Sequence, residues 1–248
     1  MDTDLGFMSS QGTTQAQPSL AQQQSFYDQR WRQFQYADRV RLARCVEILE
    51  RIHRLRIERP VIIDAGCGAG WLTGVLAVFG PAVGVDLSPE AIRLARERWP
   101  AATFFCADFI PWNYPDESAD VIVSQEVLEH VAEPRAYLKR ASDLLRHGGY
   151  LILTTPNAPV TKALSSSPAQ PIENQFDRRR LERLLGGLFT VVELTTIIPG
   201  YGHRGIYRLV NSIRLRRLEN RLRLAGSLDR LRCRLGFGLH LLCVARKP

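Results

Sequence analysis

The sequence predicts an α/β fold, in which a mostly parallel sheet carries helices on both faces. Short apolar runs alternate with helical patterns along the chain, as expected for repeated strand-helix units. One of these runs leads directly into a glycine-rich turn and then into a helical pattern. The chain has 248 residues, of which 45% are hydrophobic, and this is enough for one core within a single domain.

Seven segments have the composition of buried strands. They are residues 61–64, 82–86, 103–106, 121–124, 150–155, 190–198 and 238–245. Helices are expected between them: Ser88 and Pro89 supply an N-cap and a proline at the first helical position, and Gly148 and Gly149 are expected to end a later helix. Because crossovers between parallel strands are right-handed, the loops after the strands gather at one edge of the sheet, where ligands bind.

Residues 1–24 are predicted to be a disordered tail ahead of a single domain over residues 25–248. The tail contains six glutamines, no basic residue and few large apolar groups to offset the entropy of ordering. It lacks the positive start and apolar run of a secretory signal, and no stretch approaches the roughly 20 apolar residues of a membrane span. We therefore expect a cytoplasmic protein.

Apolar residues recur at helical spacing from Tyr36 to Ile57 and predict a helix that caps the sheet. These positions are Val40, Ala43, Val46, Leu49 and Ile52. The arginines between them alternate with Glu47, Glu50 and Glu58, so we expect the arginines on a solvated helix face.

The turn after the first strand is the most informative stretch of the chain. Gly66, Gly68 and Gly70 let the backbone turn tightly and approach a ligand, and the helix behind them offers its N-terminal amides. A dinucleotide-binding turn would need a further glycine where Trp71 stands. The turn therefore predicts a nucleotide-like pocket, but not one for NAD.

The charges around this turn indicate which ligand it takes. Asp64 precedes the glycines and Asp86 ends the second strand, where a carboxylate can accept both hydroxyls of a ribose. No lysine or arginine lies between Pro60 and Arg93, so a pyrophosphate would find no cationic partner. A sulfonium cofactor, S-adenosylmethionine, fits this pattern better than any phosphate-bearing one.

Five segments between about residues 61 and 157 together resemble the class I S-adenosylmethionine-dependent methyltransferase family, and most closely its ubiquinone-pathway O-methyltransferases. They are residues 64–70, 84–90, 106–109, 120–131 and 148–157. The resemblance implies a Rossmann-like sheet of seven strands whose last strand is antiparallel. It also implies that Asp64 and the three glycines hold the methionine portion of the cofactor and that Asp86 holds the ribose. The remaining implied cofactor residues are Leu87, Asp108, Phe109 and Gln125.

Glu126, Glu129 and His130 follow the fourth strand at spacing i, i+3 and i+4, so one helical turn would gather them on one face. In hydroxyl-methylating relatives with Glu-His-Val here, the histidine is a general base, and an ordinary pKa of about 6.5 suits that role. We take His130 as the catalytic candidate, with a histidine that only caps a helix as the alternative.

The same three residues resemble the metal ligands of Mg²⁺-dependent methyltransferases. RNA-directed relatives add a histidine that is absent from residues 172–176, so we expect a site without metal. In many relatives the N-terminal segment folds over the cofactor and contributes to the acceptor pocket. The resemblance therefore makes Phe26, Tyr27, Trp31 and Tyr36 candidate acceptor contacts.

Residues 199–236 form a basic insertion between the last two predicted strands. It has ten arginines, no lysine and only Glu219 and Asp229 as acids, a formal charge of +8 that equals that of the whole chain. Its apolar residues recur at helical spacing and predict an amphipathic helical pair, broken at Gly226. The resemblance places this insertion at the cofactor side of the sheet, where it can act as a lid.

Three partners are compatible with the insertion. Its leucines can pack on the domain or on a second subunit, as in a homodimer, which is our first expectation. Basic amphipathic helices also bind anionic membrane surfaces, which would place the protein at the membrane periphery. Nucleic acid ranks third, because only Tyr201 and Tyr207 offer stacking surfaces.

The sequence thus predicts a methyltransferase that acts in one in-line displacement on a hydroxyl oxygen of a small molecule such as a phenol, a quinol or a sugar. One alternative acceptor is RNA or another polyanion. The other alternative is a methyltransferase fold that serves as a binding module without turnover. The acceptor stays open because fold says little about substrate.

Overall fold

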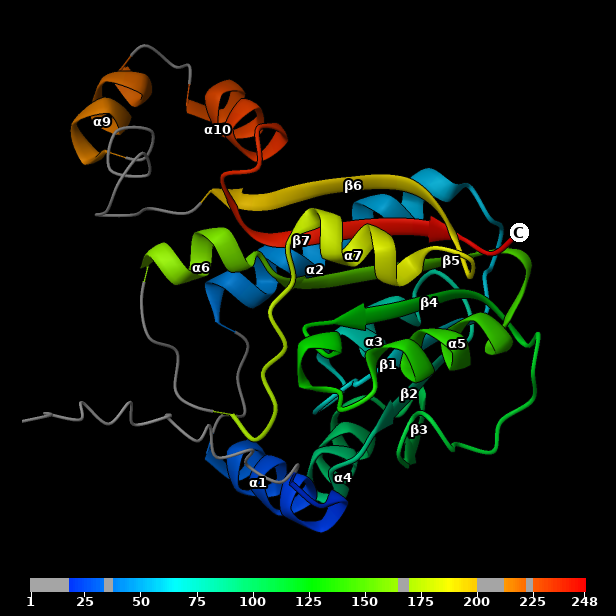
Figure 1. Cartoon of the computed structure of the whole chain (residues 1–248). Helices are drawn as coiled ribbons and strands as arrows, with labels where there is room; N and C mark the ends of the chain where they lie inside the picture. Colours follow the sequence, from blue (N-terminus) through cyan, green and yellow to red (C-terminus); the bar gives the residue numbers. More distant parts are fainter. Residues whose placement is uncertain (1–17, 34–37, 165–169, 200–211, 222–224) are drawn as a thin grey trace, which may run out of the picture.

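The computed structural model describes residues 18–33, 38–164, 170–199, 212–221 and 225–248. Seven strands form one sheet in the order β3-β2-β1-β4-β5-β7-β6 (Figure 1). Their bounds are β1 Ile62–Ala65, β2 Ala82–Asp86, β3 Thr103–Cys106, β4 Ala119–Gln125, β5 Leu145–Pro156, β6 Thr190–Pro199 and β7 Gly238–Arg246. β7 is antiparallel to both of its neighbours, and the other pairs are parallel. The predicted Rossmann-like architecture is confirmed.

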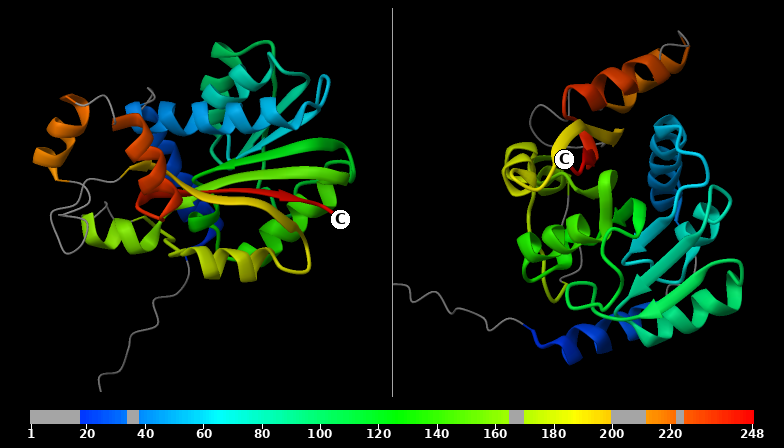
Figure 2. Two further views of the ribbon diagram at one scale, coloured as in Figure 1. Left: turned by 90° about the horizontal axis from the view of Figure 1, so that it is seen from above. Right: turned by 90° about the vertical axis from the view of Figure 1, so that its right-hand side faces the viewer.

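Helices cover both faces of this sheet (Figure 2). In the described part of the chain they are α1 Leu20–Gln33, α2 Arg39–Leu55, α3 Trp71–Leu76, α4 Pro89–Arg98, the 3₁₀ turn η1 Leu128–His130, α5 Pro134–Leu144, α6 Ala158–Leu164, α7 Arg178–Leu185, α9 Ile213–Arg221 and α10 Ala225–Arg234. Successive strand residues point to opposite faces. Ile62 and Val121 therefore pack with α2 and α3, whereas Ile63 and Ile122 pack with α5 and α7.

Two predicted boundaries differ from the structure. α1 begins at Leu20, inside the segment predicted to be disordered, while residues 1–17 lie outside the described residues. Ser19 and Gln22 form a capping box there: the Gln22 amide donates to Ser19 Oγ at 3.3 Å, and the Ser19 amide donates to Gln22 Oε1 at 2.8 Å. Gly148 and Gly149 lie within β5 and do not end α5, because Leu145 already pairs with Ala119 of β4.

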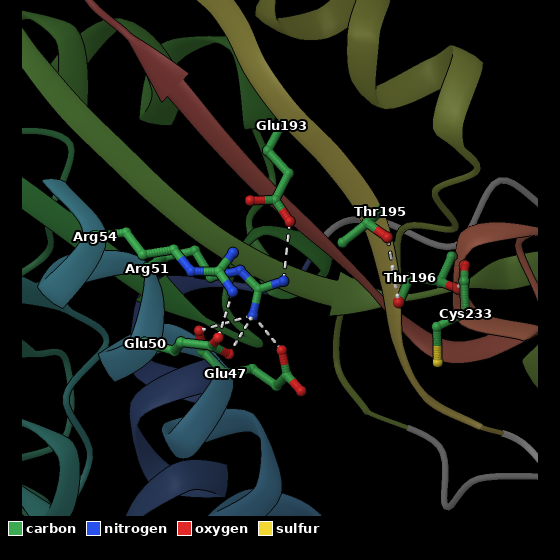
Figure 3. A network of polar contacts seen from close by, with 8 residues as sticks. All are labelled: Glu47, Glu50, Arg51, Arg54, Glu193, Thr195, Thr196 and Cys233. Atoms are coloured by element: carbon green, nitrogen blue, oxygen red, sulfur yellow. Dashed lines mark hydrogen bonds and ion pairs between the residues drawn. The ribbon is translucent and has the colours of Figure 1, made fainter. Parts of the chain in front are cut away.

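The predicted helix over residues 36–57 is confirmed as α2, but the predicted face is wrong in part. Val46 is 63% exposed, whereas Arg44 and Arg51 are buried beside Ile48 and Ile52. Long arginine stems can cover apolar surface when their guanidinium groups find partners. For Arg51 these partners are Glu47 on α2 and Glu193 on β6, whose Oε1 lies 2.9 Å from Nη2 (Figure 3).

We expect Arg51→Ala to lower the free energy of unfolding by about 2–3 kcal/mol, as measured by urea denaturation. This is below the cost of breaking a fully buried pair, because Glu47 and Glu193 are each 34% exposed and water screens them in part. Arg54→Ala is the matched control, since Arg54 is 60% exposed and, among the described residues, pairs with Glu50 alone. Equal losses in the two variants would show that the bridge to β6 adds no stability.

The described parts of the basic insertion are helical as predicted. The predicted break at Gly226 is wrong, because Gly226 lies within α10. α10 is fixed to β6 by the Thr196 hydroxyl, which donates to the Cys233 carbonyl at 2.6 Å (Figure 3). Arg232 is buried and pairs with both acids of the insertion, Glu219 and Asp229.

Three of the insertion's leucines do not pack on the domain, since Leu218, Leu231 and Leu235 are at least half exposed. Contact of these leucines with a second subunit or an anionic membrane stays a prediction. Tyr201 and Tyr207 lie outside the described residues. Across the described ranges, no helix combines the length and the apolar character that a bilayer crossing requires.

Candidate active site

A cavity of about 500 Å³ lies where β1, β2 and β4 end, and α1, α2, α6, β7 and the segment before α7 contribute to its other walls. It collects most of the residues predicted for the site. These are Tyr27, Trp31, Asp64, Gly66, Gly68, Asp86, Leu87, Asp108, Phe109, Gln125, Glu126, Glu129 and His130. Tyr36 lies outside the described residues, and α9 and α10 do not contribute to the cavity wall, so their described residues do not form the predicted lid.

The glycine turn needs backbone angles that other residues rarely adopt. Gly66, Gly68 and Gly70 have φ values of +78°, +53° and +77°. A Cβ at Gly68 would collide with the ring of Trp31, so α1 packs directly on the bare turn. Gly70 does not line the cavity: a Cβ there would meet Phe104 at 2.9 Å, so this glycine allows close packing instead of contact with a ligand.

Asp86 links the glycine turn to the start of α4. Its Oδ2 accepts the Gly68 amide at 2.8 Å, and its Oδ1 accepts the Ser88 amide at 2.9 Å. Burial raises the pKa of Asp86, although these amides oppose the shift. Asp64 is also buried and accepts the Thr73 hydroxyl at 2.6 Å; burial, together with the charge of Asp86, raises the pKa of Asp64 to about 7. The turn therefore holds two buried carboxylates, and among the described residues neither forms an ion pair with a cationic side chain.

α1 covers the cofactor end of the cavity. The Gln24 amide donates to the Leu87 carbonyl at 3.1 Å, and Asp28 contacts the Ser88 hydroxyl. Figure 1 shows α1 beside α4 as a result. Burial, followed by the charges of Asp86 and Glu129, raises the pKa of Tyr27 to about 12, so its phenol stays protonated at neutral pH.

His130 has a defined tautomer. Its Nδ1 lies 2.9 Å from the Ile172 carbonyl oxygen, and because a carbonyl only accepts, Nδ1 carries the hydrogen. Nε2 then has a free lone pair, and it lies 3.7 Å from Glu129 Oε1. Burial lowers the pKa of His130 more than the Ile172 carbonyl and the charge of Glu126 raise it. The imidazole is thus neutral at neutral pH and able to take a proton.

The three residues considered as metal ligands do not converge. Glu126, at φ +57°, precedes the 3₁₀ turn, and its side chain points to His240 instead of toward His130. Glu129 accepts the Thr155 hydroxyl at 2.9 Å, and burial raises its pKa well above the usual range, which favours the neutral acid. Within the described ranges, no three His, Cys, Asp or Glu side chains form a group that could hold a metal ion.

The cavity also contains residues that sequence reasoning did not find. Arg44 of α2 and His240 of β7 line it together with Glu126. His240 Nδ1 lies 2.8 Å from Glu126 Oε2, and His240 Nε2 lies 3.2 Å from Arg44 Nη1. The charges of His240 and Arg44 outweigh the effect of burial and lower the pKa of Glu126. His240 lies 196 residues beyond Arg44, so no local pattern could reveal their contact.

Known proteins resemble this chain in amino-acid sequence. A family model described as a methyltransferase domain matches residues 18–226. The chain is 35% identical over 123 residues to a trans-aconitate 2-methyltransferase of Afipia carboxidovorans, covering 48% of this chain and 46% of that protein. It is 36% identical over 100 residues to a ubiquinone biosynthesis O-methyltransferase of Parvibaculum lavamentivorans, covering 38% and 40%. The chain thus spans less than half the length of these two curated relatives.

Solved structures agree on the fold. A protein from Pyrococcus horikoshii OT3 superposes with a TM-score of 0.61 at 18% identity, covering 89% of this chain and 99% of that chain. An S-adenosylmethionine-dependent methyltransferase from Mesorhizobium loti superposes with a TM-score of 0.56 at 19% identity, covering 80% and 96%. Because the family model matches most of the chain and the sheet order agrees with this fold, the protein belongs to the class I S-adenosylmethionine-dependent methyltransferase family.

Proposed function

We propose that this protein transfers the methyl group of S-adenosylmethionine to a hydroxyl oxygen of a small molecule such as a phenol, a quinol or a sugar. The observation that carries the proposal is the unprotonated Nε2 of His130, in the same cavity as Asp64 and Asp86. The similarity to ubiquinone biosynthesis O-methyltransferases supports the choice of oxygen.

The residues of the glycine turn fit this cofactor. Two buried carboxylates with raised pKa values stand beside bare glycine backbone, and a positively charged ligand would stabilise their ionised forms. Asp64 and the turn would hold the amino-acid end of the cofactor, and Asp86 would hold the ribose. Leu87, Asp108 and Phe109 line the part of the cavity where adenine would lie. When bound, S-adenosylmethionine supplies an electrophilic methyl group.

His130 would accept the proton of the acceptor hydroxyl. Its Nδ1 is fixed on the Ile172 carbonyl, so Nε2 faces the cavity in the form that can take a proton. Transfer of that proton raises the nucleophilicity of the hydroxyl oxygen as its bond to the methyl carbon forms. Tyr27 and Trp31 line the same cavity and would orient the acceptor ring.

The decisive experiment incubates the purified protein with S-adenosylmethionine and a panel of phenols, quinols and sugars, and quantifies S-adenosylhomocysteine and methylated product by mass spectrometry. We expect a methyl ether and stoichiometric S-adenosylhomocysteine. Methylation of RNA but of no small molecule would favour the polyanion alternative. Binding of S-adenosylhomocysteine without turnover on cell extracts would favour the binding module.

The affinity for S-adenosylhomocysteine should rise with pH and level off above about pH 7. Asp64, with a pKa of about 7, is partly protonated in the free protein, and a bound ammonium group favours its ionised form. Binding therefore releases a proton, and below pH 7 the affinity should fall about tenfold per pH unit. Calorimetry in buffers of different ionisation enthalpy measures this proton directly. Asp64→Asn should remove the pH dependence; a dependence retained in that variant would assign it to another group.

The stability of the free protein should change in the opposite direction over this interval. The folded pKa of Asp64 lies above its value of 3.8 in an unfolded chain. Between these two pH values the folded state binds more protons, so the contribution of Asp64 to stability falls as pH rises toward 7. Thermal unfolding of the free protein and of Asp64→Asn as a function of pH tests this.

A further inference from the structure

We propose that the methyl acceptor carries an oxyanion group, a carboxylate or a phosphate, and that Arg41 and Arg44 of α2 bind it, with Arg30 of α1 beside them. This inference deepens the proposed function and rests on it. All three side chains line the cavity, although the arginines of α2 were expected to face solvent.

Arg44 carries a buried donor that no described protein group satisfies. The residue is only 9% exposed, and its Nε has no hydrogen-bond partner within the described part of the chain. Glu126 Oε1, the nearest carboxylate oxygen, lies 3.9 Å away, which is beyond hydrogen-bond distance. A buried donor without a partner is costly. Since this Nε has almost no accessible surface, an oxyanion in the cavity would contact the rest of the Arg44 guanidinium and would reach Nε only after a shift of the side chain.

Arg41 lies three residues before Arg44, so both side chains leave the same face of α2. Among the described residues Arg41 has no ion-pair partner, and its guanidinium stacks over the Trp31 ring at 5.4 Å from the centroid. Burial lowers the pKa of Arg41, and the neighbouring charge of Arg44 lowers it further. Two like charges held together in a partly buried wall favour an anion between them.

The charge balance of the wall leads to the same conclusion. Glu126 is the carboxylate that offsets Arg44, and it is shared with His240. Within the described part of the chain, neither Arg30 nor Arg41 forms an ion pair with a carboxylate. Asp64, Asp86, Asp108, Glu129 and Glu173 also line the cavity, but none of them forms an ion pair with Arg30 or Arg41, so the wall beside α2 keeps positive charge that no described carboxylate pairs with.

The basic end lies within reach of the reacting atoms. Trp31 packs on Gly68 of the turn and stacks with Arg41, so the arginine stands beside the cofactor site. The charge of Arg30 affects the pKa values of both Arg41 and His130. An acceptor bound through its oxyanion to these arginines can therefore place a hydroxyl near His130. Planar guanidinium groups suit carboxylate and phosphate because both accept two parallel hydrogen bonds.

Three matched probes test the inference on protein saturated with S-adenosylhomocysteine, by calorimetric titration. They are 4-hydroxybenzoate, 4-hydroxyphenyl phosphate and the neutral 4-hydroxybenzamide. We expect at least one anion to bind about tenfold to hundredfold more tightly than the amide, the range for hydrogen bonds to a charged group. The preferred anion distinguishes a carboxylate acceptor from a phosphate acceptor. The inference would be overturned if all three probes bound with equal affinity, or if neither anion showed saturable binding.

Variants locate the subsite. Arg41→Gln should abolish the preference for the anion and leave the affinity for the amide unchanged. Arg41→Lys should retain part of the preference, because lysine keeps the charge but lacks the planar guanidinium group. Arg39→Gln is the matched control, since Arg39 is exposed at the start of α2 and does not line the cavity. If the Arg44→Gln variant folds, it should have the same effect as Arg41→Gln. If it does not fold, the result for Arg41→Gln alone decides the question. A preference unchanged in Arg41→Gln would refute the assignment.

Turnover of the same probes separates this inference from the proposed function. Tight anion binding without methyl transfer would support the subsite and count against hydroxyl methylation. Equal methylation of 4-hydroxybenzamide and 4-hydroxybenzoate would support the function and count against the subsite.

Discussion

Replacement of His130 by glutamine is expected to lower the rate of methyl transfer by about 10²–10⁴-fold, the usual contribution of a positioned general base. Glutamine can still donate to the Ile172 carbonyl, so the loop at residue 172 should keep its place. The glutamine amide has no basic nitrogen, so it cannot take the proton that His130 Nε2 would accept. Single-turnover kinetics with saturating cofactor would measure the loss, and unchanged affinity for S-adenosylhomocysteine would show that the cofactor site is intact.

The pH profile distinguishes a general base from a positioning role. Because burial lowers the pKa of His130, kcat/KM for the acceptor should stay constant at neutral pH and fall only below about pH 6.5, when it is measured at saturating cofactor so that Asp64 does not contribute. His130→Gln should lose this acid limb. Unchanged turnover across this range in the variant would eliminate the base, and a small loss with the acid limb intact would reduce His130 to a positioning residue.

Asp86→Asn is expected to weaken the binding of S-adenosylhomocysteine by about tenfold to hundredfold, the equivalent of losing one hydrogen bond to a charged group. The carboxylate accepts the amides of Gly68 and Ser88 at the same time. The asparagine amide would face one of these donors with a donor of its own. The glycine turn would then lose its link to α4, and the ribose would lose an acceptor.

In Asp86→Asn the free energy of unfolding should change far less than the free energy of binding S-adenosylhomocysteine. Since burial raises the pKa of Asp86, the ionised carboxylate costs the free protein stability, and a neutral side chain removes this cost. Thermal unfolding would verify the fold, and Asp116→Asn, at a side chain that is 66% exposed and outside the cavity, would control for the loss of an acid. Cofactor affinity equal to that of the unmodified protein would show that Asp86 does not hold the ribose.

The cofactor side of the protein could be predicted because its determinants are local. A strand, three glycines and a following helix occupy consecutive residues, and Asp64 and Asp86 stand at the ends of strands whose order follows from right-handed crossovers. The structure places Asp64, Gly66, Gly68 and Asp86 in the cavity as predicted, while Gly70 serves packing.

α2 shows where local reasoning fails. Periodicity located the helix and the burial of Ile52, but it placed Val46 on the buried face and Arg44 and Arg51 on the solvent face, where arginine usually lies. Arg51 is buried because it pairs with Glu193 of β6. Arg44 is buried because it contacts His240 of β7 and Glu126 at the end of β4. Each partner lies far along the chain, so the partners that offset the burial of these charges could not be read from sequence.

The amino-acid sequence by itself determined the sheet, the glycine turn and the class of cofactor, because hydrophobic periodicity and glycine conformation act over neighbouring residues. Only the tertiary structure decided the tautomer of His130, the pairing of Glu126 with His240 and the basic wall beside α2. These features depend on which distant side chains and carbonyls share a buried space, and burial of polar groups is favourable only where such partners meet.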